Sequence, residues 1–300
     1  MNLEARILIC GKAWHLQREH KLDEALEGTR QGVDLARQYG DSRTEAFGLK
    51  CLGRLHRIAA EDGPERGRQW NLDESGRLLA EAIERFDAID GASHTSEVGA
   101  CHTLLARTEL VCHRLLGDDA ALARALAATG RAEDLLSPDC GKDYLDFAIL
   151  RAELYVEHRH PARARDLLDE VIDHLHENPA TADNSEILAR AYLARANAAE
   201  NKTKAVRYYR KAAMIFDRLG LSYAAAVANW SVVEVERHAG GSLKITAEDV
   251  RQLNALTPDP RTRLAALDEA KRLDGERIGN GSITWRPDWR RLVMKNRFQD

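Results

Sequence analysis

Three cationic side chains within one predicted helix have a spacing suited to binding chemistry. Lys50, Arg54 and Arg57 are separated by four and three residues, which places them on one face of a helix. Guanidinium groups form charge-assisted, often bidentate hydrogen bonds with carboxylates and phosphates. The cluster therefore predicts a surface for an acidic or carboxylate-bearing segment. An ordinary solvated helix face is one alternative. Pairing within the chain is another, through three acidic residues that follow: Glu61, Asp62 and Glu65.

Two cysteine–histidine pairs suggest a metal site, but their spacing argues against one. Cys101-His102 and Cys112-His113 lie eleven residues apart, or about 16 Å along a helix axis. A zinc site needs three or four ligands around one point. We therefore expect buried thiols here, with no metal and no cofactor. Since the chain also contains no nucleophile elbow, paired catalytic carboxylate motif or dinucleotide fingerprint, we expect no enzymatic activity.

The C-terminal residues 279–300 are basic and aromatic. Trp285 and Trp289 precede Arg290 and Arg291, and a segment rich in glycine leads into them. Large aromatic side chains are poorly tolerated free in water. We expect this tail either to fold back onto its own chain or to contact a partner. Stacking on nucleic acid is a weaker alternative.

Composition indicates a folded, helical protein. The 300 residues are 44% hydrophobic and 31% charged, with only 7 prolines, and alanine, leucine, arginine and glutamate, all good helix formers, dominate. The net charge of −4 is too small to favour nucleic acid. There is no 18-residue apolar run, no basic-then-apolar start and no disulfide framework among the five cysteines. These features predict a cytoplasmic location without membrane contact.

A repeated pattern of small residues predicts how the helices pack. One small residue is followed by another about twelve residues later and by a third seven residues after that. The pattern is clearest in two sets: Ala152, Ala164 and Val171, and Ala13, Ala25 and Gly32. Small side chains let two helix backbones approach closely, so the recurrence predicts stacked helical hairpins.

The pattern predicts five hairpins and the first helix of a sixth. We expect helices at about 3–18, 22–39, 43–60, 71–89, 97–116, 120–136, 144–158, 162–176, 185–200, 202–219 and 222–238. Further close-packing positions are Gly53, Ser75, Ala82, Ala106, Ala125, Ala132, Ala194, Ala205 and Ala212. Residues 61–67 form a polar surface insertion. The predicted organisation is a repeat array at 1–240, capping helices at 241–278 and the tail at 279–300.

The repeats resemble the tetratricopeptide repeat over about residues 3–238. The resemblance rests on the Leu52-Gly53 and Tyr208-Tyr209 pairs and on the small-residue sets with Tyr155. The long helices and the Gly40-Asp41 ending are similar to repeats of bacterial signalling ATPases and transcriptional regulators, where such repeats act as sensor arms. No ATPase phosphate-binding motif is present. The resemblance therefore implies an all-α, right-handed superhelix. It also implies that the chain has the sensing or scaffolding role of such systems without their ATPase activity.

In tetratricopeptide arrays the first helix of each hairpin lines a concave groove. The resemblance implies the following groove residues: Lys50, Arg54, Arg57, Arg107, Glu153, Arg195, Trp230 and Glu234. We expect a non-enzymatic scaffold, adaptor or sensor subunit that binds a protein or peptide, acidic in part, within a hetero-complex. The alternative is a regulatory receptor for a small molecule or short signalling peptide in a bacterial regulatory or defence system. A third possibility is an enzyme or a nucleic-acid-binding protein whose active surface carries no recognisable sequence motif.

Overall fold

The computed structural model describes most of the first 221 residues and part of the helix that follows. The described residues are 3–12, 21–62, 65–89, 94–178, 182–221 and, within 224–235, 224–225, 227–229, 231–232 and 235. The chain divides into two compact units, residues 1–150 and 151–300. Ala13, the predicted capping helices and the tail lie outside the described residues.

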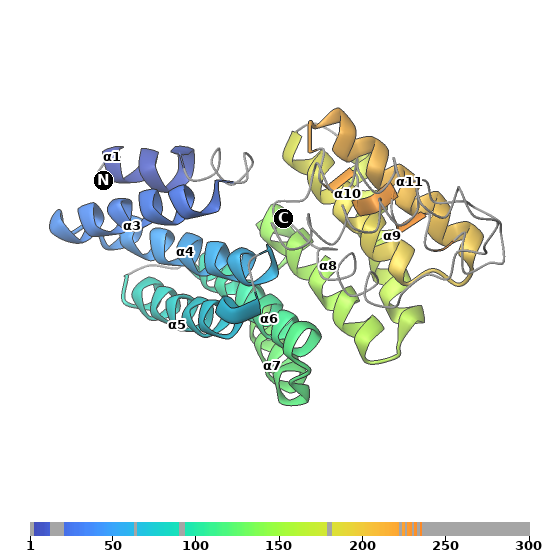
Figure 1. Ribbon diagram of the computed structural model, residues 1–300, viewed down its shortest axis with the longest axis horizontal. Coiled ribbons are helices and arrows are strands. Elements are labelled where there is room, and N and C mark those ends of the chain that lie inside the picture. The colour runs from blue at the N-terminus through green and yellow to red at the C-terminus, as the bar shows by residue number, and fades with distance from the viewer. Residues whose placement is uncertain are drawn as a thin grey trace, which may run out of the picture. The chain divides into compact units, whose positions relative to one another are not determined.

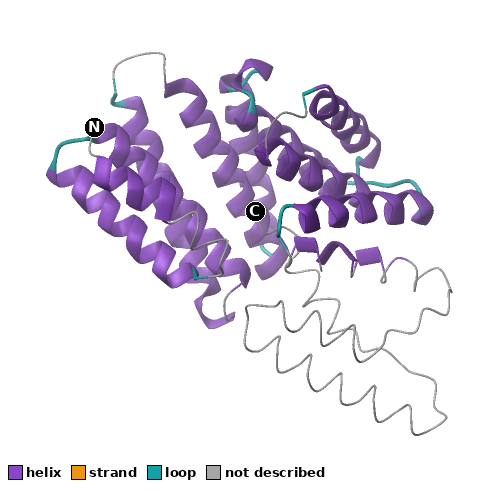
Figure 2. Ribbon diagram, turned by 90° about the horizontal axis from the view of Figure 1, so that it is seen from above, coloured by secondary structure: helices purple, strands orange, loops and turns teal. Residues whose placement is uncertain are grey.

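Helices make up almost all of the described chain (Figures 1 and 2). In order, these are α1 (Leu3–Arg6), the π-helix η1 (Ile7–Lys12), α3 (Leu22–Gln38), α4 (Ser42–Asp62), the 3₁₀ turn η2 (Glu65–Gly67), α5 (Arg68–Asp87), α6 (Thr95–Leu116), α7 (Asp119–Leu135), the 3₁₀ turn η4 (Pro138–Cys140), α8 (Lys142–Glu157), α9 (Pro161–Glu177), α10 (Ala182–Asn197) and α11 (Lys202–Arg218). No strand occurs in the described residues, and the all-α prediction is confirmed. None of these described helices is long and apolar enough to cross a membrane.

Several consecutive helices pack as pairs. In the first unit the most extensive packing joins α4 to α5 and α6 to α7, and in the second unit it joins α10 to α11. Most predicted helix bounds agree with the structure to within three residues. The boundary between the two units falls inside α8.

The predicted insertion at 61–67 is shorter than expected. Helix α4 continues to Asp62, and α5 begins at Arg68. Glu61 was expected on the surface, which is wrong, because its side chain is only 6% exposed and accepts a hydrogen bond from Arg57. At the other end Asn71 Nδ2 donates to the carbonyl of Gly67 at 3.1 Å. These two contacts extend helical structure into the polar segment from both sides.

The boundary between α3 and α4 forms as its sequence predicts. Gly40 adopts a left-handed backbone conformation with φ of +65°, which costs glycine little because it has no Cβ. Asp41 then caps α4, because its carboxylate accepts from Thr44 N at 3.2 Å and from the Thr44 hydroxyl at 2.9 Å.

The predicted close-packing positions are buried throughout the described helices. The following alanines are at most 8% exposed: Ala25, Ala82, Ala106, Ala125, Ala132, Ala152, Ala164, Ala194, Ala205 and Ala212. Gly53 shows why small residues are needed. A Cβ there would lie 2.7 Å from Leu79 Cγ and 3.2 Å from the Ser75 carbonyl oxygen on α5. The backbones of α4 and α5 therefore approach at a position that excludes even one methyl group.

A pair of glycine-to-alanine variants tests this close approach. In Gly53→Ala the overpacking, which costs about 1–3 kcal/mol, outweighs the gain in helix propensity, so the free energy of unfolding should fall by about 1 kcal/mol. Gly76→Ala on α5 is the control, because a Cβ there meets nothing within 4 Å. It should raise the free energy of unfolding by about 0.5–1 kcal/mol. Urea denaturation followed by circular dichroism measures both, and effects of the same sign would contradict the close-packing argument.

Candidate functional site

Ionic and thiol side chains gather around Lys50 in the first unit. Lys50, on α4, donates a hydrogen bond to the carboxylate of Glu97 on α6, and its ammonium lies 4.6 Å from the centroid of the Phe47 ring. The Lys50 side chain is 13% exposed and that of Glu97 is 25% exposed. Because α4 and α6 are the first helices of two successive hairpins, this ion pair joins neighbouring repeats.

The electrostatics around Lys50 are of mixed sign. Burial acts to lower the pKa of Lys50, but the charge of Glu97 and its hydrogen bond to the ammonium oppose this effect, so the pKa is raised and the ammonium stays charged. Asp143, at the start of α8, has a raised pKa because of burial and the negative charge of Glu97, against the opposing charge of Lys50. The surface therefore combines the charged ammonium of Lys50 with two carboxyl groups, those of Glu97 and Asp143.

The cysteines near this ion pair are poorly ionised. Burial raises the pKa of Cys51 to about 11 and that of Cys101 to about 12, although Lys50 opposes both shifts. Burial also raises the pKa of Cys112 to about 12. Cys101 is fully buried and Cys112 is 8% exposed, which confirms the prediction of buried thiols at both positions.

The burial of the thiols predicts the order in which they are alkylated. Only the thiolate is nucleophilic, so at about pH 8 iodoacetamide should modify exposed Cys10 and half-buried Cys140 before Cys51, Cys101 and Cys112. Mass spectrometry of tryptic peptides over a time course gives the order. In guanidinium chloride the differences should vanish, and equally rapid labelling of Cys101 and Cys10 in the folded protein would contradict this environment.

The cationic stripe of α4 is only partly available to a partner. Arg57 is fully buried, and its Nη1 donates to Glu61 Oε2 at 2.6 Å. This is the pairing within the chain that the sequence left open as an alternative. Arg107 on α6 is 4% exposed. Arg54 is half-buried, so Arg54 and the paired Lys50 are the members of the stripe that reach the surface.

The predicted groove residues of the second unit are also buried and paired. Arg195 on α10 is 3% exposed; its Nε donates to Asp169 Oδ1 at 2.8 Å and its Nη1 lies 3.6 Å from Glu200 Oε2. The guanidinium carbon also lies 4.8 Å from the centroid of the Tyr208 ring. Glu153 on α8 is 5% exposed. The Arg195 side chain thus connects α10 to Asp169 on α9 and to Tyr208 on α11. A contact of Arg195 or Glu153 with a partner stays a prediction.

Several predicted contact residues lie outside the part of the chain that the structure describes. The side chains of Trp230 and Glu234 lie outside the described residues, as do the tail residues Trp285, Trp289, Arg290 and Arg291. Within the described residues no group of three or more histidine, cysteine or acidic side chains is arranged to hold a metal ion.

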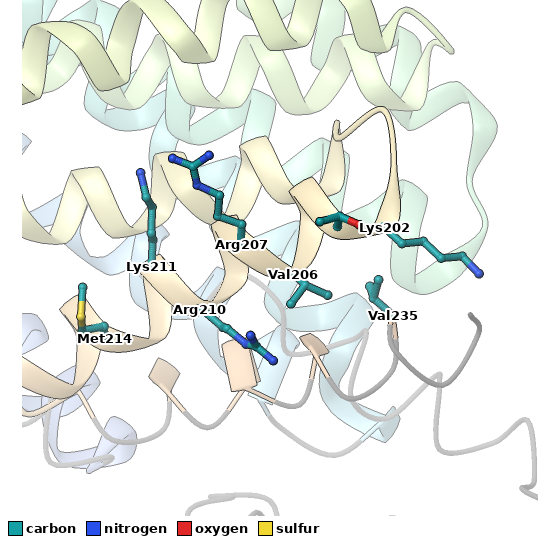
Figure 3. A pocket seen from close by; sticks show the side chains of 8 residues that line it. Lys202, Val206, Arg207, Arg210, Lys211, Met214 and Val235 are labelled. Carbon is teal, nitrogen blue, oxygen red and sulfur yellow. The ribbon is translucent and has the colours of Figure 1, made fainter. Parts of the chain in front are cut away.

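The sequence reasoning missed a basic surface on α11. A cleft of about 580 Å³ runs along this helix, with Val206, Met214 and Val235 among its apolar lining and cationic side chains at its edges. Arg207 and Lys211 project on one side of the helix, whereas Arg210 projects on the other (Figure 3). The sequence itself shows a cluster of cations on this helix: Arg207, Arg210 and Lys211. They lie on the second helix of a hairpin, whereas the resemblance places groove residues on first helices.

Comparison with known proteins identifies a fold and no family. No family model matches the chain, and no curated protein matches it significantly. A solved structure, BtubC (BKLC) from P. vanneervenii, is similar in fold, with a TM-score of 0.52 and 15% sequence identity. The match covers 88% of this chain and 95% of that chain. At this identity the similarity concerns the helical architecture alone.

Proposed function

We propose that this chain is a tetratricopeptide-like, right-handed superhelix that acts as a non-enzymatic scaffold, adaptor or sensor subunit in the cytoplasm. Two findings support the proposed architecture. Several helices pair in chain order, namely α4 with α5, α6 with α7 and α10 with α11, and the small residues on them are buried. In addition, a helical protein of 15% identity is similar over 88% of this chain. Arrays of this kind expose long faces of successive helices, which suits the binding of an extended segment.

The observation that carries the proposed function is the mixed-charge surface around Lys50. Its side chains come from three first helices: Lys50 and Arg54 from α4, Glu97 from α6 and Asp143 from α8. All four are half-buried, neither deep in the core nor fully solvated. Partly desolvated charges bind a complementary partner more strongly than exposed ones. We propose a protein or peptide partner with an acidic residue at Arg54.

Charge reversal at Arg54 tests this proposal. Arg54→Glu should weaken partner binding by about 1–3 kcal/mol, the range for a hydrogen bond to a charged group. Arg43→Glu is a matched control on the same helix, because Arg43 is exposed in the first turn of α4. The partner is first obtained by co-purification with the tagged full chain, and affinities are then measured by isothermal titration calorimetry at low salt, where such contacts are strongest.

The two variants have distinct expected outcomes. Loss of affinity with Arg54→Glu and near-normal affinity with Arg43→Glu support the proposed surface. Equal affinities would place the partner elsewhere on the molecule. Arg57 is unsuitable for this test because its substitution would act through folding, given its complete burial.

The alternative function, a receptor for a small molecule, is favoured by one observation. The second unit contains a hollow of about 360 Å³ lined by apolar and cationic side chains. Cavities of about 300–1,000 Å³ commonly hold small ligands.

A further inference from the structure

The hollow in the second unit lies between α10 and α11, beside the end of α9. Its apolar lining consists of Leu188, Met214, Ile215 and Leu219. Polar side chains from all three helices complete it, among them His176 from α9 and Arg218 from α11. The hollow thus offers both an apolar wall and a polar one.

A hydrogen-bonded chain of three side chains forms the polar wall. Tyr192, on α10, is 2% exposed. Its hydroxyl oxygen lies 2.7 Å from His176 Nε2 and accepts a hydrogen bond from Lys211 Nζ at 3.3 Å. The Lys211 ammonium also lies 4.7 Å from the centroid of the Tyr192 ring, which stacks on Tyr208 at 5.9 Å. These contacts hold the ammonium against a buried aromatic platform.

In the described part of the chain, no carboxylate balances the positive charge at this hollow. Among the described residues, Lys211 contacts only the tyrosine hydroxyl and rings, and Arg218 Nη2 contacts Met214 Sδ at 3.6 Å. No ion pair within that part of the chain involves either cation. Three carboxylates adjoin lining residues in the sequence but do not line the hollow: Glu177, Glu186 and Asp217.

The start of α10 adds charge of the same sign. Ser185 lies in the first turn of this 16-residue helix and lines the hollow. The N-terminal end of a helix carries a partial positive charge. The dipole therefore favours an anion in the same space as Lys211 and Arg218.

We propose that this hollow binds a small amphiphilic carboxylate, an anion with an apolar portion of several carbon atoms. The carboxylate lies between Lys211 and Arg218, where two fixed cations replace its water. The apolar portion packs against Leu188, Ile215 and Leu219. This site goes beyond the proposed scaffold function, because it uses the second unit and takes a small ligand in place of a protein segment.

The experiment uses octanoate as the probe and Met214 as the reporter. The chain contains 3 methionines, so the methyl resonances of ¹³C-methyl-methionine-labelled full-length protein are few, and Met214→Leu assigns the relevant one. Octanoate, kept below its micelle concentration, should shift the Met214 resonance saturably. The neutral 1-octanol tests the requirement for charge, and acetate tests the requirement for an apolar portion. Both should bind at least about tenfold more weakly, since each lacks one of the two contacts.

Variants on one helix separate this site from a general charge effect. Lys211→Met and Arg218→Met should each raise the Kd for octanoate at least about tenfold. Arg207→Met is the matched control: it removes one positive charge from α11 at a residue that does not line the hollow, and it should leave the Kd within about twofold. Circular dichroism establishes that each variant folds.

The proposal is overturned by any of three results. These are the absence of a saturable shift with octanoate, equal binding of octanoate and 1-octanol, and an effect of Arg207→Met as large as that of Lys211→Met. None of these results bears on the partner surface at Arg54, so the two proposals fail separately.

Discussion

Replacing Glu61 with alanine should lower the free energy of unfolding by about 3–5 kcal/mol, because it removes a carboxylate that pairs with a fully buried cation. Arg57 is 0% exposed, and its Nη1 lies 2.6 Å from Glu61 Oε2. Removing a carboxylate that pairs with a buried charge leaves more of the desolvation penalty of that charge uncompensated. Chemical denaturation of the full chain, monitored by circular dichroism, measures the loss.

Two further variants decide whether burial causes the effect. Glu74→Ala removes a similar contact, since Glu74 Oε1 lies 2.7 Å from Arg77 Nη2, but there the side chains are 26% and 58% exposed. That loss should stay below about 1 kcal/mol. The apolar double variant Arg57→Met/Glu61→Leu should recover most of the stability lost in Glu61→Ala. Equal losses in Glu61→Ala and Glu74→Ala would mean that Arg57 is solvated in solution.

Truncation of Phe86 should lower the free energy of unfolding by a similar amount, about 3–5 kcal/mol. Phe86 lies on α5 at 1% exposure within the core cluster that α3, α4 and α6 share. Its ring stacks on that of His94, with the centroids 6.0 Å apart. Phe86→Ala therefore removes a large apolar side chain and leaves a cavity between several helices.

A second aromatic residue on the same helix serves as the comparison. Trp70 is 59% exposed, and its described ring contact is an edge-on approach to His56 at 5.3 Å. Trp70→Ala should cost about 1 kcal/mol or less. Thermal denaturation of both variants distinguishes core from surface. A cost for Trp70→Ala as large as that for Phe86→Ala would show that Trp70 is covered in solution.

The helical architecture could be predicted because its determinants are local. Good helix formers fill the segments, and Gly40 with Asp41 marks a boundary that the structure reproduces in detail. The small-residue positions were also predictable, because close approach of two helix backbones excludes larger side chains. Gly53 illustrates this, since a Cβ there would meet Leu79 at 2.7 Å.

The state of the charged residues could not be predicted in the same way. Helical spacing correctly places Lys50, Arg54 and Arg57 on one helix, but it cannot distinguish a side chain that faces solvent from one that faces a neighbouring helix. Arg57 is buried against Glu61, one turn along α4, and Lys50 pairs with Glu97, 47 residues away on another helix. Which charges remain available depends on contacts between distant segments.

The sequence by itself determined the helices, their ends and the small residues through which they pair, because propensity, capping and backbone approach act within a few residues or one helix contact. Only the tertiary structure decided which cations stay accessible and which side chains enclose a hollow. The hydrogen-bonded side chains of His176, Tyr192 and Lys211 join three helices. The residue pattern of a single helix cannot predict such an arrangement. Burial and the position of counterions depend on the packing of distant helices, and these set the chemistry of both proposed sites.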